Sequence, residues 1–311
     1  MRTPLSAAGL ATALALVLIA CGSADPGPAL SLPPPGKLPR SKTSHVVMVV
    51  MENKERGQAL DARDARYTRT LVRRYASPQS LFAIRHPSLP NYLALLGGDT
   101  FGIDSDCTSC HVDAPNLVDR LEAAGRSWKA YMEGMPNACF KGADHGGYAK
   151  KHNPFMYFDS IANDPARCNR VVPYTRISRD LKRGRLPDFA WITPDLCHDT
   201  HDCGVRTGDR FLSHLAPALI RELGPHGILV VAWDEGSSDR GCCGLAHGGR
   251  IATVVAGPDV RRGATGSGSY TQYSILRTIS DALGVQPVGH AGDASTRPLD
   301  ALFKRPPSRA P

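Results

Sequence analysis

The strongest constraint on the fold is an apolar run that ends in an acid and an amide. After its first residue the run His45–Met51 is uninterrupted by polar side chains, which is typical of a strand buried on both faces of a parallel sheet. A second run, Gly227–Trp233, ends in the same way. Binding groups gather at the carboxyl ends of strands in open α/β sheets. The sequence therefore predicts a metal or phosphate site built from the residues that follow the two runs: Glu52, Asn53, Asp234 and Glu235.

Predicted strands alternate with predicted helices along most of the chain. We expect strands over residues 45–51, 80–84, 127–131, 189–192, 228–233 and 251–256, and helices over 60–75, 89–96, 117–124, 208–223 and 273–283. This alternation predicts an α/β fold, a three-layer α/β/α sandwich with a mainly parallel central sheet.

Histidines and acids follow two further predicted strands. His86 follows the strand over 80–84, and the densest cluster follows the strand over 189–192. Imidazoles can donate to phosphoryl oxygens or protonate a leaving group, and carboxylates can orient them or bind a cation. The cluster therefore supplies candidate catalytic residues: His198, Asp199, His201 and Asp202.

Simpler explanations exist for each of these groups. The histidine cluster could be a solvated loop, Asn53 could cap a helix with Glu52 at the positive helix end, and Asp234-Glu235 could be a polar turn. His152, in Lys151-His-Asn-Pro154, could belong to a turn or contact phosphate.

The first residues predict export. A basic start at Arg2, a short apolar core over 10–19 and the sequence Leu18-Ile-Ala-Cys21 resemble a bacterial lipoprotein signal, in which Cys21 is lipidated. An ordinary secretory peptide is the alternative. We expect a signal peptide over residues 1–20, a Pro/Gly-rich tether over 21–42, a catalytic domain over 43–303 and a frayed tail over 304–311. The lipid on Cys21 would hold the protein on a membrane of the cell envelope.

Eight of the nine cysteines lie beyond Cys21. An even number in an exported chain favours disulfides, and we expect Cys197 to pair with Cys203 and Cys139 with Cys168. Zinc is the alternative, because Cys107-x-x-Cys110 with His111, and Cys242-Cys243 near His247, resemble metal-ligand spacing.

The formal charge of +8 favours anionic ligands or anionic lipid headgroups. Basic residues are scattered with few aromatic residues between them, so we expect no nucleic-acid partner. We expect a monomer.

Several ordered motifs resemble the bacterial phosphoesterase family of secreted acid phosphatases and phospholipases C, a branch of the alkaline-phosphatase-like superfamily. They include Glu52-Asn53, His86-Pro-Ser-Leu-Pro-Asn-Tyr92, the block 116–133, His152-Asn-Pro154, the cluster 198–203 and Trp233-Asp-Glu-Gly236. The resemblance implies that a divalent metal ion is held by Glu52, Asn53, Asp234 and Glu235. The identity of the metal stays open among Ca, Mg, Mn and Zn, because oxygen ligands suit the first three and nearby histidines would admit zinc. It also implies that His86, His201 and His152 contact phosphate or the leaving group.

Asn116 departs from the family pattern. It stands where related enzymes often carry a Ser or Thr nucleophile, and an amide cannot form a phospho-enzyme as a hydroxyl does. Thr108 or Ser109, a metal-bound water or a hydroxyl of the substrate could replace it. A second departure is Lys54-Glu-Arg56, where aromatic or small residues often follow the Glu-Asn pair.

We therefore expect an exported, lipid-anchored phosphoesterase. The first expectation is an acid phosphatase that hydrolyses phosphomonoesters, including phosphoinositides, by metal-assisted phosphoryl transfer. A phospholipase C that cleaves a phospholipid diester is one alternative, and a non-catalytic lipoprotein that binds phosphorylated ligands is the other.

Overall fold

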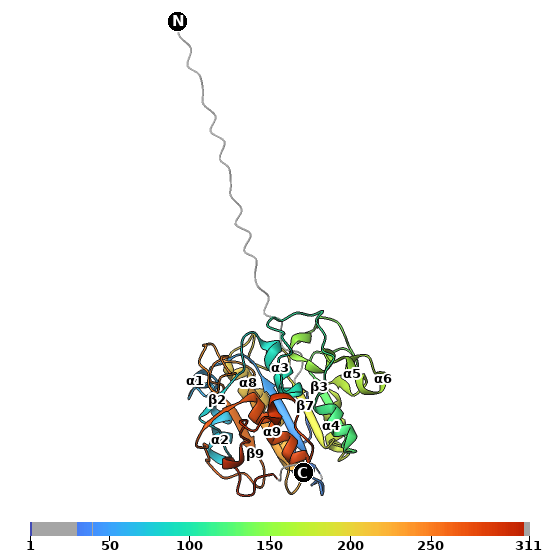
Figure 1. Cartoon of the computed structure of the whole chain (residues 1–311), viewed down its shortest axis with the longest axis vertical. Helices are drawn as coiled ribbons and strands as arrows, with labels where there is room; N and C mark the ends of the chain where they lie inside the picture. The colour runs from blue at the N-terminus through green and yellow to red at the C-terminus, as the bar shows by residue number, and fades with distance from the viewer. Residues whose placement is uncertain (2–29, 39, 308–311) are drawn as a thin grey trace.

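Six strands form the central sheet of this computed structural model, which describes Met1, residues 30–38 and residues 40–307. Their order across the sheet is β6-β3-β7-β1-β8-β9 (Figure 1). The strands are β1 (Val46–Met51), β3 (Trp128–Met132), β6 (Val171–Pro173), β7 (Phe189–Thr193), β8 (Ile228–Trp233) and β9 (Thr253–Ala256). All neighbours run parallel except β8 and β9, so the predicted α/β fold with a mainly parallel sheet is confirmed.

The central position of β1 explains its uninterrupted apolar sequence. It pairs with β7 on one side and with β8 on the other, and all six of its residues are buried. In this register Met51 lies opposite Trp233. The residues that follow β1 and β8 therefore leave the sheet side by side, as the sequence predicts.

Helices cover both faces of the sheet. On one face α3 (Ser88–Gly97) packs against α9 (Gln272–Leu283) and α4 (Leu117–Ala123), and on the other α2 (Arg66–Arg74) packs against α8 (Val205–Glu222) (Figure 1). Shorter helices are α1 (Arg56–Ala59), α5 (Asp159–Ala162), α6 (Pro165–Cys168) and α7 (Arg176–Lys182). The 3-10 turns are η1 (Pro35–Lys37), η2 (Lys150–His152), η3 (Pro154–Met156), η4 (Gly289–Gly292) and η5 (Asp300–Leu302), and a small hairpin joins β4 (Asp144–His145) to β5 (Tyr148–Ala149).

Two sequence predictions differ from the structure in detail. The strand expected over 80–84 is β2 (Ser80–Phe82), which pairs with β10 (Ser269–Thr271) outside the central sheet. The helix expected over 60–75 is shorter, because it begins at Arg66 after the turn that contains Asp61 and Asp64. The edge strand β6 and helix α7 were not predicted, since three strand residues give no readable periodicity.

All eight described cysteines are paired in disulfides. The bonds join Cys107 to Cys110, Cys139 to Cys168, Cys197 to Cys203 and Cys242 to Cys243, and they include both predicted pairs. None of these thiols is left to bind zinc, so the zinc alternative is wrong for these cysteines.

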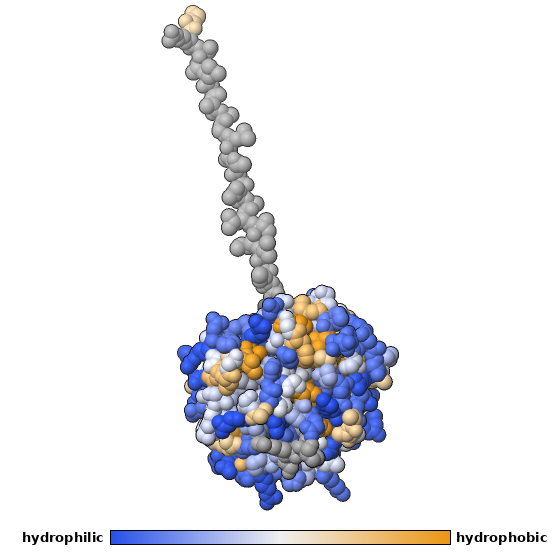
Figure 2. Space-filling model, viewed as in Figure 1, coloured by the Kyte–Doolittle hydropathy of each residue, from blue (hydrophilic) through white to orange (hydrophobic). Residues whose placement is uncertain are grey.

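The first described segment packs on the domain. Leu38 is buried, its carbonyl accepts a hydrogen bond from Arg221 on α8, and Ser31 contacts Ser178 on α7. The predicted signal peptide beyond Met1, together with Cys21, lies outside the described residues. No helix within the described residues is long and apolar enough to cross a membrane. On the face seen in Figure 2, small hydrophobic patches lie among predominantly hydrophilic residues.

Candidate active site

Two buried carboxylates meet where β1 and β8 end. Glu52 and Asp234 are fully buried, and the backbone N–H of Asn53 donates to Asp234 Oδ1 at 2.8 Å. The Asp234 N–H donates to the Met51 carbonyl at 2.8 Å, which extends the pairing of the strands into the site. The two predicted metal-binding strands thus converge.

The loop after β7 adds a third buried carboxylate. The Asp199 carbonyl accepts the Glu52 N–H at 2.8 Å, and Thr200 Oγ1 donates to the Glu52 carbonyl at 2.9 Å. Asp199 Oδ1 accepts the His201 N–H at 2.7 Å, and the Cys197–Cys203 disulfide closes the loop. These bonds fix the Asp199 carboxylate beside Glu52.

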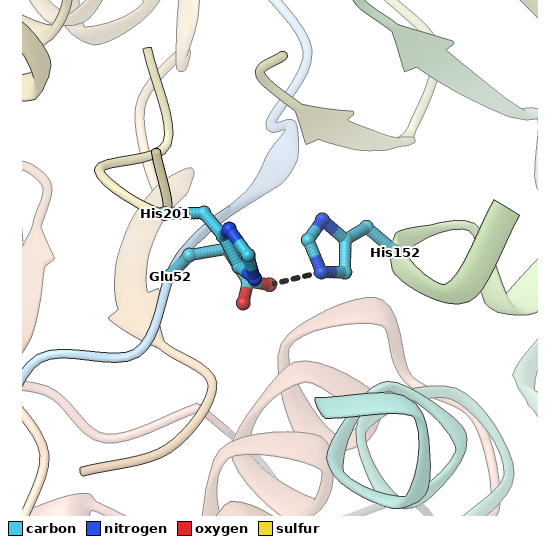
Figure 3. Close-up of side chains that lie close together, drawn as sticks. All are labelled: Glu52, His152 and His201. Carbon is cyan, nitrogen blue, oxygen red and sulfur yellow. Dashed lines mark ion pairs between the residues drawn. The ribbon is translucent and has the colours of Figure 1, made fainter. Parts of the chain in front are cut away.

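Two histidines face this acidic centre. His152 Nε2 lies 3.3 Å from Glu52 Oε1, and His152 Nδ1 lies 3.4 Å from Asp199 Oδ2 (Figure 3). His201 lies beside His152, with ring centroids 5.6 Å apart, and its Nε2 is 3.5 Å from Lys151 Nζ. Lys151 also pairs with Asp106 at 2.9 Å. The structure therefore brings together His152, His201 and a lysine ammonium at one side of the carboxylates.

Ser88 lies on the same centre and was not among the predicted site residues. Its buried Oγ donates to Glu52 Oε2 at 3.1 Å and lies 3.4 Å from Glu235 Oε1. It is the first residue of the ten-residue helix α3, whose positive end favours negative charge. Tyr92, one turn further along α3, donates a short hydrogen bond to Glu52 Oε1. The signal for Ser88 was present in the motif His86-Pro-Ser-Leu-Pro-Asn, as a hydroxyl at a helix start.

His86 approaches from the loop before α3. Its Nδ1 makes a short hydrogen bond with Glu235 Oε2, and its Nε2 lies 3.3 Å from the Ser238 carbonyl. The His86 side chain is 35% exposed, so it can reach a bound ligand. Burial lowers the pKa of His86, but the hydrogen bond and the charge of Glu235 outweigh burial and raise it overall. The contact brings His86, a predicted catalytic residue, next to Glu235, a predicted metal ligand.

The pKa values of the buried acids show how unfavourable this cluster of negative charge is without a cation. Burial raises the pKa of Glu52 and of Asp199 well above their usual values, and neighbouring carboxylates raise them further. Burial, with the charge of Glu235, raises the pKa of Asp234 to about 7. Burial lowers the pKa of His152 well below its usual value, and Lys151 and His201 add to this effect.

Three buried polar atoms in the cluster lack a hydrogen-bond partner. They are His152 Nε2, Asp199 Oδ2 and Asp234 Oδ2. Buried polar atoms are normally satisfied, so orphaned atoms on ligand-type side chains indicate a missing partner. Ligand atoms of Glu52, His152 and His201 also lie within 4.8 Å of one another. The residues present fit a divalent cation held by carboxylate oxygens and imidazole nitrogen.

A second cluster consists of Glu133, Asp195 and the predicted catalytic residue His198. His198 Nδ1 lies 3.0 Å from Glu133 Oε2 and 3.5 Å from Asp195 Oδ1. Asp195 Oδ1 accepts the N–H groups of Cys197 and His198, and Glu133 Oε2 accepts the Asp195 N–H. These contacts brace the turn that leads to Asp199.

The other predicted residues lie further from the buried centre. Asn116 is buried as the N-cap of α4, where its Oδ1 accepts the Val118 N–H at 2.9 Å and its Nδ2 donates to Ser160 Oγ at 3.1 Å. Asp202 is 59% exposed and pairs with His201 Nδ1 at 2.7 Å. The Asn53 side chain accepts a hydrogen bond from Lys54, so at this site Asn53 contributes its backbone N–H to Asp234.

This geometry agrees with comparisons to known proteins. A model of the phosphoesterase family matches residues 51–286, which include every residue of both clusters. The chain belongs to the phosphoesterase family.

Curated relatives carry phosphatase names. The phosphate-repressible acid phosphatase of Penicillium chrysogenum is 32% identical over 67% of this chain and 52% of its own length, and an acid phosphatase of Aspergillus fumigatus is 29% identical over 68% and 48%. A phosphatidylinositol-3-phosphatase of Mycobacterium tuberculosis is 31% identical over 81% of this chain and 80% of that protein. The chain thus spans about half the length of the two fungal enzymes.

Solved structures share the fold. An alkaline phosphatase superfamily protein from Vibrio parahaemolyticus superposes with a TM-score of 0.52 at 13% identity, covering 79% of this chain and 67% of that chain. A sulfatase from Pseudoalteromonas gives 0.51 at 12% identity, covering 86% and 73%. At these identities the likeness shows the alkaline-phosphatase-like fold alone.

Proposed function

We propose that the protein is a phosphomonoesterase of the acid phosphatase type, acting on phosphomonoesters that include phosphoinositides. The observation that carries the proposal is the Ser88 hydroxyl at the start of α3, hydrogen-bonded to Glu52 and close to Glu235. The relatives include acid phosphatases and a phosphatidylinositol-3-phosphatase, which supports the substrate class.

Ser88 supplies the nucleophile that Asn116 cannot. Its Oγ attacks phosphorus while the P–O bond to the alcohol breaks, and its proton passes to the Glu52 or Glu235 carboxylate. Water then cleaves the phosphoserine, which releases inorganic phosphate and restores the hydroxyl. Because the chain carries its own hydroxyl at the site, this sequence of steps does not need the substrate hydroxyl on which the phospholipase C alternative depends.

A divalent ion bound by Glu52, Asp234, Asp199 and the two histidines would stabilise negative charge on phosphoryl oxygens when present. Lys151 lies beside His201 and presents an ammonium group to the same region. His86 and His201 are the partly exposed imidazoles of the site, and each can donate to phosphate or to the leaving oxygen. Metal, lysine and imidazoles together meet the charge of a phosphomonoester dianion.

We also propose that the protein is exported and held in the cell envelope by a lipid on Cys21. The lipoprotein-type signal and the four disulfides support export. Mass spectrometry of the membrane fraction tests the anchor: the mature chain should begin at a diacylated Cys21, and a soluble mature chain starting elsewhere would contradict it.

Hydrolysis of two nitrophenyl substrates tests the function. We expect phosphate release from p-nitrophenyl phosphate and little nitrophenol from bis(p-nitrophenyl) phosphate, with both activities absent in Glu52→Gln. Cleavage of the diester alone would move the protein to a phospholipase C type of activity. No turnover of either substrate, across divalent metals and from pH 4 to 9, would favour a phosphate-ligand-binding protein.

A further inference from the structure

One depression lies away from the active site, at the opposite edge of the sheet. A cavity of about 850 Å³ adjoins one of about 560 Å³, and the two share Thr70, Arg74, Tyr75 and Pro258. Their walls include residues that precede β1, residues that precede β8, and Pro258 after the antiparallel β9. We name this continuous depression the amino-edge groove.

The amino-edge groove is strongly basic. No carboxylate is among the described residues that line it. Its cationic side chains are Arg40, Lys42, Arg73, Arg74, Arg221, Arg262 and Lys304. All are solvent-exposed except the half-buried Arg221, and none forms an ion pair in the described part of the chain. Seven uncompensated cations around one concave surface repel one another, so an anionic partner would stabilise the arrangement.

Apolar and aromatic groups lie between these cations. Tyr67 and Leu71 from α2 line the groove, with the α2 C-cap residue Tyr75 and Ile220 from α8. Basic side chains interleaved with tyrosine and aliphatic groups suit a lipid–water interface, where the phosphates meet the cations and the rings lie at headgroup level. Helix α7 and its C-cap residue provide a contrast, because the exposed Arg176, Arg179 and Arg183 line neither cavity of the groove.

The chain itself brings this groove close to the segment expected to hold the membrane anchor. Arg40 and Lys42 line the groove and follow directly on the segment 30–38 that packs against α7 and α8. Residues 21–29 can extend at most about 30 Å. A domain tethered this closely meets the membrane surface at high effective concentration, so even a moderate attraction is sufficient for docking.

We propose that the amino-edge groove docks the domain on an anionic lipid surface, with headgroup phosphates in contact with its seven cations. Docking in this way turns the carboxyl edge of the sheet, and with it Glu52 and Ser88, away from that membrane. Hydrolysis of a soluble phosphomonoester therefore does not depend on the groove.

Vesicle binding by the full-length chain tests the proposal. Cosedimentation is measured with vesicles of phosphatidylcholine alone and of equal parts phosphatidylcholine and phosphatidylglycerol, at low and physiological salt. The groove variant is R73Q/R74Q/R262Q, and the matched control, called the α7 control, is R176Q/R179Q/R183Q, which removes the same charge from α7 and its C-cap residue. The N-terminal apolar segment is identical in all three proteins, so its contribution cancels.

We expect the groove variant to bind anionic vesicles at least tenfold more weakly than wild type, with unchanged binding to neutral vesicles, while the control stays within twofold. Added salt should weaken wild-type binding and reduce the difference. Both variants should hydrolyse p-nitrophenyl phosphate at the wild-type rate and melt at the wild-type temperature. The docking surface and the active site are thereby tested separately.

Four results would overturn the proposal. If the groove variant binds anionic vesicles as strongly as wild type, the groove has no role in docking. If the α7 control loses binding to the same extent, net charge alone explains the effect. Displacement of the protein from anionic vesicles by glycerol phosphate at the same phosphate concentration would make a soluble phosphate the ligand. Selective retention on immobilised polyglutamate, with weak vesicle binding, would indicate an acidic protein partner instead.

Discussion

Two clusters of carboxylates and histidines lie along the loop after β7, and they differ in how their polar atoms are satisfied. In the first, Glu52, Asp199 and His152 are almost fully buried, and His152 Nε2 and Asp199 Oδ2 have no hydrogen-bond partner. In the second, Glu133, Asp195 and His198 are partly exposed and hydrogen-bonded to one another and to backbone N–H groups. The same residue types therefore form one cluster with unsatisfied buried ligand atoms and a second in which the ligand atoms are hydrogen-bonded, although the spacing of either could hold a metal ion.

The comparison teaches that residue type and spacing alone do not identify a ligand site. Burial without partners raises the free energy of the first cluster, and a bound divalent ion would remove that cost. The second cluster already has its donors, and it holds the backbone that presents Asp199. Variants that affect one cluster and leave the other intact can separate the two roles.

The largest effect is expected at Ser88, which contacts only the first cluster. Ser88→Ala should lower kcat for p-nitrophenyl phosphate more than about a thousandfold, because among the described residues no other serine or threonine hydroxyl is hydrogen-bonded to the Glu52 carboxylate. Thermal stability should change little. Ser109→Ala is the matched control, since Ser109 lies in an exposed loop and was an alternative nucleophile; loss of activity in that variant with retention in Ser88→Ala would reverse the assignment.

Stability of the metal-free protein should depend on pH through the first cluster. The pKa of Asp234 is raised from its usual value to about 7, so the folded state binds more protons than the unfolded state between about pH 4 and 7. Stability contributed by this group is therefore lost as pH rises through that window. In the presence of a chelator we expect a melting temperature about 5 °C lower at pH 8 than at pH 5.

Added divalent metal should raise the melting temperature more at pH 8 than at pH 5, because metal binding requires the deprotonated carboxylates. A metal-free protein that is as stable at pH 8 as at pH 5 would contradict the electrostatic description of the first cluster.

A smaller effect is expected in the second cluster. Glu133→Gln weakens the support of His198 and of the turn before Asp199, so kcat should fall about tenfold while one metal ion per chain is retained. Metal content and phosphate release measured on the same samples distinguish this from a ligand role. Complete loss of metal in Glu133→Gln would show that the second cluster binds the ion as well.

The smallest effect on catalysis is expected at Asn116. Asn116→Ala removes the cap of α4, so the free energy of unfolding should fall by about 1 kcal/mol and kcat should stay within twofold. Denaturant unfolding and steady-state kinetics measure the two quantities. A collapse of activity with unchanged stability would instead give Asn116 a catalytic role.

The sequence predicted the parts of this molecule that depend on local pattern. The apolar runs before Glu52 and Asp234 were sufficient to place two carboxylates at neighbouring strand ends, because buried parallel strands have few alternatives. The contact between His86 and Glu235 was not predicted, because it depends on how the loop before α3 packs against the loop after β8. Spacing alone could not tell that His198 turns toward Glu133 while His152 turns toward Glu52, since that depends on how distant loops pack.

Ser88 was overlooked for a different reason. The family resemblance points to position 116 for the nucleophile, and the sequence alone gives no reason to prefer the hydroxyl in His86-Pro-Ser-Leu-Pro-Asn over those of Thr108 and Ser109. Its role became visible only when the structure placed its Oγ on Glu52. Helix starts that carry a hydroxyl after a proline are therefore useful sites to examine next to any predicted acidic centre.

Metal content of three purified proteins tests the central claim most directly. Wild type, Glu52→Gln and Glu133→Gln are loaded with a divalent metal, separated from free metal and measured by inductively coupled plasma mass spectrometry. We predict one tightly bound ion per chain in wild type and Glu133→Gln, and none in Glu52→Gln. An ion retained by Glu52→Gln, or lost only from Glu133→Gln, would contradict the assignment of the buried first cluster as the metal centre.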